Sequence, residues 1–144
     1  MDKFIVTLDE YFGKKAPQLP AGLKEFIVKV SPYLAIIGLI LFGLAIIPLI
    51  SLVFGLGVMN AYVAAVVPMT SVYISFVIMI IVEIMYLLAI PGLFKRTKKA
   101  WNFMFYAQIA GAVSSLVSYN ILGAIIGLVI GFYILFQVRS YYKN

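Results

Sequence analysis

The sequence predicts an all-α integral membrane protein, a four-helix bundle that follows an N-terminal interfacial amphipathic helix. Of the 144 residues, 65% are hydrophobic and only 11% are charged, and the mean hydropathy is +1.12. Soluble domains are about 45–50% apolar and about 25% charged, and a chain this short cannot bury such an excess of apolar surface. Long uncharged segments also match the ~20 residues that a helix needs to cross a bilayer.

Residues 1–30 are expected to form amphipathic helices on the cytoplasmic surface of the membrane. In the first helix, apolar side chains recur at helical spacing and predict a side that faces the membrane interface. These residues are Phe4, Ile5, Leu8, Tyr11 and Phe12. Charged residues on the other side are typical of an interfacial helix that attracts anionic lipid headgroups.

Residues 31–144 are predicted to form the transmembrane bundle. Ser31 and Pro32 have the pattern of a helix N-cap followed by proline at the first helical position, so the first span should begin there. Pro91 and Gly92 should end the second span. The four spans are expected at residues 32–54, 69–90, 100–118 and 121–138.

The connections between the spans differ in length. Residues 55–68 are predicted to form an outer loop with a short helix, because glycine, asparagine and proline interrupt this apolar stretch. The stretch is too short to serve as a fifth span. Tyr119 and Asn120 form a very short turn, so the last two spans must be antiparallel neighbours. Trp101, at the start of the third span, is expected to be an interfacial anchor.

The basic residues predict the orientation of the spans. All 11 Lys and Arg fall within residues 3–29, residues 95–99 and residues 139–143, and none falls in either connection on the other side. Only an even number of spans places these three segments on one side, and the positive-inside rule identifies that side as the cytoplasm. The net charge of +6 therefore follows membrane topology, and nucleic acid is not an expected partner.

The composition argues against an enzyme. With no cysteine and no histidine, the chain lacks disulfides, thiolate nucleophiles, imidazole bases and the usual zinc or haem ligands. No serine has a histidine to activate it, no pair of intramembrane carboxylates is present, and no phosphate-binding loop is found. We therefore expect no catalytic residues, no metal and no cofactor.

Glu83 is the one acidic or basic residue inside any predicted span, and a charge at mid-bilayer costs about 2.5–3.5 kcal/mol on insertion scales. It should therefore face the bundle interior, where the Gln108 amide is its expected partner and Tyr86 and Tyr106 are further donors. One interpretation is a proton or cation site. The other, which we favour from sequence, is a neutral carboxyl that hydrogen-bonds across helices.

Small residues recur at helical spacing in the last two spans. Gly123, Gly127 and Gly131 form a glycine zipper in the fourth span, and Ala107, Gly111 and Ser115 form a similar stripe in the third. Stripes of this kind let helix backbones approach closely in lipid. The partner helix could belong to the same chain, to a second copy or to another membrane protein.

Two functional hypotheses follow. The favoured one is a non-enzymatic inner-membrane protein that acts as a self-associating, accessory or scaffold subunit. The alternative is a small proton- or cation-linked transporter or channel that uses Glu83, with a polar path supplied on the outer side by serine, threonine, asparagine and glutamine side chains.

The C-terminal half also carries a family resemblance. The segments Ala89–Arg96, Asn120–Gly127 and Phe136-Gln137 resemble small uncharacterised four-span bacterial membrane proteins. The resemblance implies a bacterial inner-membrane setting. It brings no activity, ligand or site residue that could be transferred to this chain.

Overall fold

The computed structural model describes residues 2–54 and 68–143, and this part of the chain is helical with no strand. The α-helices are α1 Asp2–Leu8, α2 Ala21–Val53, α4 Met69–Phe94, α5 Lys98–Val117 and α6 Ile121–Gln137. A π-helix, η1 Asp9–Lys15, follows α1, and a 3-10 turn, η2 Arg139–Tyr141, follows α6. The all-α prediction is confirmed. The predicted outer loop falls almost entirely outside the described residues.

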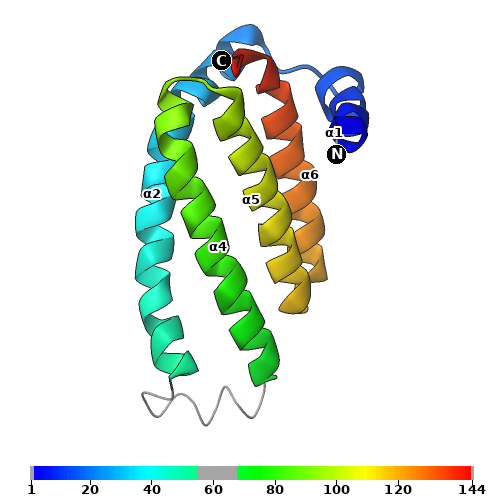
Figure 1. Cartoon of the computed structure of the whole chain (residues 1–144). Helices are drawn as coiled ribbons and strands as arrows, with labels where there is room; N and C mark the ends of the chain where they lie inside the picture. Colours follow the sequence, from blue (N-terminus) through cyan, green and yellow to red (C-terminus); the bar gives the residue numbers. More distant parts are fainter. Residues whose placement is uncertain (1, 55–67, 144) are drawn as a thin grey trace.

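The four long helices run antiparallel in chain order, and both termini lie toward the same end (Figure 1). We call that end the proximal end. The opposite end, where a short turn joins α5 to α6, is the distal end. Three segments in the described part of the chain are long and apolar enough to cross a membrane. They are Ala21–Pro48, Thr70–Phe94 and Ile121–Tyr141.

The remaining long helix, α5, is less apolar because Asn102, Gln108 and two adjacent serines lie within it. It packs against both α4 and α6, and Trp101, Phe105 and Ala107 on it are buried. A helix that is covered by protein on two sides can hold polar residues that a lipid-facing helix cannot.

The first long helix begins at Ala21 and runs through residue 30 without a break, so the predicted helix start at Ser31 is wrong. Pro32 lies inside α2 and has no N–H to donate to the Val28 carbonyl one turn earlier. The Ser31 hydroxyl donates to that carbonyl instead, at 2.9 Å. Ser31 therefore satisfies the carbonyl that Pro32 leaves without a donor, and it does not cap the start of a helix.

The second long helix also continues past its predicted end. Pro91 lies inside α4, and the helix ends at Phe94. The chain then turns through Arg96, which has a positive φ of 53°, and Thr97 caps α5 by accepting a hydrogen bond from the Ala100 amide at 3.3 Å. A Cβ at Gly92 would lie 2.5 Å from Thr97 Oγ1. Glycine at this position lets the two helices approach closely.

An aromatic cluster forms the core of the proximal half. Phe105 is 1% exposed, and its ring centroid lies 5.5 Å from that of Trp101, 5.4 Å from that of Phe132 and 5.9 Å from that of Phe136. From the N-terminal segment, the ring of Phe12 in η1 lies 6.1 Å from that of Phe132, and the ring of Phe4 in α1 lies 6.5 Å from that of Phe105. The α1 and η1 segment therefore packs on α5 and α6.

Candidate functional site

A cavity of about 670 Å³ lies among the distal halves of α4, α5 and α6, with Phe42 of α2 contributing to its wall. It extends from the distal ends of these helices to the level of Glu83. Its polar lining combines hydroxyls, one amide and one carboxyl group. These side chains are Ser71, Ser75, Glu83, Tyr86, Gln108, Ser114, Ser115 and Ser118.

Helical periodicity explains why these side chains meet. On α4 the lining residues recur every three or four positions and form one face, and α5 presents a matching polar face from Gln108 to Ser118. At the distal end the hydroxyls of Ser75 and Ser118 lie 3.0 Å apart and link the two helices. The serine and glutamine side chains that the sequence suggested for an outer polar path are thus gathered around one space, whereas Thr70 does not line it and Asn60 lies outside the described residues.

Glu83 is half-buried and lines this cavity. Counted along α4 at 1.5 Å per residue, it lies ~16 Å from Phe94 and ~21 Å from Met69, close to the middle of the helix. Within the described residues, no hydrogen bond or ion pair joins its carboxyl group to another side chain. A carboxyl group in this position can bind a proton or a cation that enters the cavity.

The predicted pairing of Glu83 with Gln108 is wrong. The Gln108 amide nitrogen donates to the Gly127 carbonyl of α6 at 2.8 Å, and the Gln108 side chain occupies the space that a Cβ at Gly131 would need. Gln108 therefore crosslinks α5 to α6. Tyr86 lines the cavity with Glu83, whereas Tyr106 is not among its lining residues and packs edge-on to Phe105 at 5.6 Å.

The glycine stripe does not make a continuous helix contact. The Gln108 side chain packs against Gly131, and Gly123 is close to the Asn120 side chain, which caps α6. Gly111 and Gly127 line the cavity, and a Cβ added at either would meet no other group within 4 Å. The absence of side chains at these two glycines leaves the cavity open. Of the stripe on α5, Ala107 and Ser115 also line it.

A second cavity of about 350 Å³ lies in the proximal half among all four long helices. Phe42, Tyr86 and Gln108 line both cavities and so separate them. The proximal cavity is mostly apolar. Tyr142 and Ser31 also line it. The Ser31 hydroxyl donates to the Val28 carbonyl, so the Tyr142 hydroxyl donates to Ser31 Oγ, at 2.9 Å. Burial raises the pKa of the Tyr142 phenol, which keeps it protonated.

Several residues expected at the membrane interface instead face protein. Trp101 is 2% exposed and Ile5 is 8% exposed, and Leu8 and Phe12 pack against the same core. Trp101 Nε1 donates to the Leu135 carbonyl at 2.9 Å. Phe4 and Tyr11 remain exposed. Helical spacing identified the apolar side of the first helix correctly, but α5 and α6 cover most of that side.

Sequence reasoning did not predict the role of Gln137, which is 2% exposed. Its amide nitrogen donates to the Phe12 carbonyl at 2.8 Å, and its amide oxygen accepts from the Leu19 N–H at 3.2 Å. Tyr133 adds a hydrogen bond to the Pro17 carbonyl at 2.7 Å. A glutamine inside an apolar helix was the available signal, because such a side chain needs partners when it is buried.

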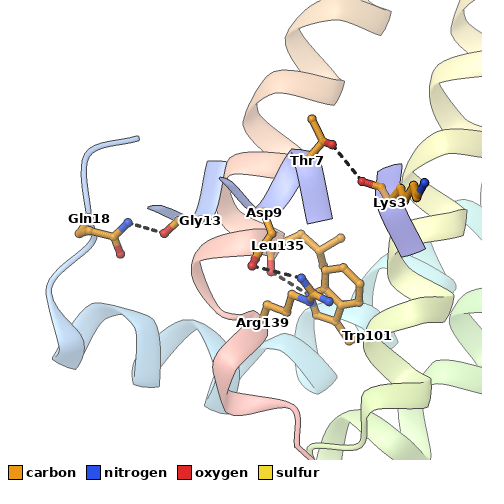
Figure 2. A network of polar contacts seen from close by, with 8 residues as sticks. All are labelled: Lys3, Thr7, Asp9, Gly13, Gln18, Trp101, Leu135 and Arg139. Carbon is orange, nitrogen blue, oxygen red and sulfur yellow. Dashed lines mark hydrogen bonds and ion pairs between the residues drawn. The ribbon is translucent and has the colours of Figure 1, made fainter. Parts of the chain in front are cut away.

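Charged groups hold the same segment to the end of α6. Arg139 lies 3.2 Å from the Asp9 carboxylate, and its guanidinium lies 5.0 Å from the Trp101 ring centroid. Figure 2 shows Arg139 between these two residues, with local hydrogen bonds from Thr7 to Lys3 and from Gln18 to Gly13 nearby. Residues 2–20 are therefore attached to α5 and α6 by packing, hydrogen bonds and an ion pair.

Comparison of the chain with protein-family models, with curated proteins and with solved structures gave no match. Within the described residues, no three or more His, Cys, Asp and Glu side chains are grouped so that they could hold a metal ion.

Proposed function

We propose that the chain is a non-enzymatic, four-span protein of the bacterial inner membrane that binds a proton or cation at Glu83 and acts as a small transporter or channel. One observation carries this proposal. Glu83 lines the distal cavity together with hydroxyl and amide groups, and its carboxyl group is not paired with any described residue. A structural carboxyl would need an interhelical partner, and Gln108 is occupied elsewhere.

The charge distribution supports a cytoplasmic location for the proximal end. Basic residues of the described chain precede or begin α2, flank the α4–α5 turn and follow α6, all near the end that carries the termini (Figure 1). By the positive-inside rule, we expect the distal cavity on the outer side. A proton or cation from outside would meet the serine hydroxyls first and Glu83 last.

Passage to the cytoplasmic side would require a change at Phe42, Tyr86 and Gln108, which separate the two cavities. Oxygen atoms of hydroxyl and amide groups can replace part of the hydration shell of a cation in the distal cavity. The proximal cavity offers few such groups. In this proposal Glu83 is the binding site, and the step past Phe42 is the gated one.

The first test is ion flux in liposomes that contain the purified protein, under an imposed proton or potassium gradient. Wild type should conduct above protein-free liposomes, and Glu83→Gln should reduce the flux to the protein-free level, because the amide cannot bind a proton or a cation as a carboxylate does. Glu25→Gln, the same substitution at an exposed acid in α2, should conduct like wild type.

Equal flux from wild type and Glu83→Gln would exclude Glu83 as the binding site. Absence of flux from wild type under both gradients would remove the transport proposal for these ions. Loss of flux in Glu25→Gln as well would point to a general effect of charge.

A substitution that fills the cavity gives a second prediction. Gly127→Leu would project a side chain into the distal cavity, where a Cβ meets no neighbour within 4 Å. We expect the flux to fall severalfold while the protein keeps its oligomeric mass and its unfolding temperature. Sedimentation in detergent and the liposome assay measure the two quantities on the same preparation.

The same glycine supports a second candidate, the scaffold or self-associating subunit. A Cβ added at Gly111 or Gly127 would meet no other group of the described chain within 4 Å, so a helix from a second copy or from a membrane protein partner could occupy this face. In that case Gly127→Leu would reduce the oligomeric mass, and Glu83→Gln would leave it unchanged. The mass of the Gly127→Leu protein therefore separates the two candidates.

A further inference from the structure

A depression of about 520 Å³ at the proximal end is lined by basic side chains from separate parts of the chain. They come from η1, from the first turns of α2 and α5, and from the residues that follow α6. They are Lys14, Lys24, Lys98, Arg139 and Lys143. Asp9 is the acidic residue of this lining. Folding thus gathers cations that are as far apart in the sequence as residues 14 and 143.

Most of these charges are not neutralised by the chain. The Asp9 carboxylate pairs with Arg139 at 3.2 Å, but within the described residues none of the four lysines forms an ion pair. Lys24 Nζ donates to the neutral Gln18 amide oxygen at 2.7 Å. Like charges around one depression repel one another, so the site favours an anion that enters it.

The depression also offers an uncharged donor, the Ser140 hydroxyl. The buried Trp101 and Phe136 side chains line it as well. The Arg139 guanidinium lies over the Trp101 ring, 5.0 Å from its centroid, and Figure 2 shows the two side chains close together. Several donors that converge from a fixed frame suit a phosphate group, which accepts hydrogen bonds on several oxygens.

The position of the depression along the apolar helices identifies the source of that phosphate. One candidate membrane-spanning segment starts at Ala21 and another ends at Tyr141, so the depression lies where the apolar surface ends. Lipid phosphates lie at this level of a bilayer, and basic pockets between helices on the cytoplasmic side bind anionic headgroups.

We propose that this depression binds the phosphate group of an anionic phospholipid, held by Lys14, Lys98 and Lys143 with Arg139 at its base. The proposal shares the membrane location with the proposed function but does not depend on Glu83. Bound lipid would crosslink the N-terminal segment, α5 and the C-terminal end, and would add to the contacts made by Gln137.

The test measures binding of a soluble short-chain phosphatidylglycerol to the full-length protein in a neutral detergent, by titration calorimetry. The site variant carries Lys14→Gln, Lys98→Gln and Lys143→Gln. The control variant carries Lys3→Gln, Lys29→Gln and Lys95→Gln, which remove the same charge from exposed residues outside the depression. Short-chain phosphatidylcholine and inorganic phosphate are titrated into wild type in parallel.

We expect phosphatidylglycerol to bind wild type and the control variant with similar affinity, and the site variant on the order of 100-fold more weakly, since each basic residue near a surface contributes about a fivefold factor. Phosphatidylcholine should bind more weakly than phosphatidylglycerol. If phosphatidylglycerol bound equally weakly to both variants, the attraction would come from the overall positive charge, and the proposed site would be wrong. If inorganic phosphate bound as tightly as phosphatidylglycerol, the proposal that the bound phosphate belongs to a lipid would be wrong. Flux through Glu83 is not affected by either outcome.

Discussion

Phe105→Ala should lower the free energy of unfolding by about 3–5 kcal/mol, the range for removal of a buried aromatic side chain. Phe105 is 1% exposed and contacts the rings of Trp101, Phe132 and Phe136 at centroid distances of 5.4–5.9 Å. Alanine would leave a cavity between α5, α6 and the first helix. Denaturant titration in detergent micelles, followed by Trp101 fluorescence, measures the change.

The matched control is Phe54→Ala, because Phe54 is 69% exposed and its removal leaves no internal cavity. Its unfolding midpoint should stay close to that of wild type. If Phe105→Ala were no more destabilising than Phe54→Ala, the aromatic cluster would not be the stabilising core of the proximal half.

Gln137→Leu should release residues 2–20 from the bundle. Leucine has a similar size but cannot bond to the Phe12 carbonyl or the Leu19 N–H, and each buried polar group left without a partner costs about 1–3 kcal/mol. The aromatic contacts of Phe12 alone would then have to hold the segment. We expect faster hydrogen exchange at Leu19 and faster proteolysis between residues 13 and 20.

Gln18→Leu is the matched control for this change. Gln18 is exposed, and its hydrogen bonds stay within residues 13–24, so the segment should remain protected in that variant. Unchanged exchange at Leu19 in the Gln137→Leu protein would mean that packing and the Asp9–Arg139 ion pair are sufficient to hold the segment.

Local rules predicted the long helices well where packing did not override them. The turn at Tyr119 and Asn120 and the bounds of the last two helices were predicted to within two residues, because caps and turns depend on neighbours in sequence. The same rules failed at Pro32 and Pro91. A proline can remain inside a helix when another group satisfies the carbonyl that it frees, as Ser31 does for Val28.

Three of the four residues predicted for the candidate site line one cavity, whereas Tyr106 does not, and the predicted pairing of Glu83 with Gln108 is wrong. Glu83, Tyr86 and Gln108 do line one cavity, since an acid at mid-helix must avoid lipid. Which of them touch depends on the rotation of each helix about its axis, and one-dimensional periodicity does not determine relative rotation. Gln108 faces Gly127 and Gly131 of α6 rather than Glu83, and this leaves the carboxyl group facing the cavity.

The sequence by itself determined that the chain is all-helical, with long apolar helices, an amphipathic start and one acid placed far from any helix end, because hydropathy and helical periodicity are local properties. Only the tertiary structure decided what covers each face. It placed the apolar side of the first helix on Phe105 and Phe132, and it gathered distant lysines around one depression. Contacts between residues more than a hundred positions apart, such as Phe12 with Gln137, arise only when the helices pack.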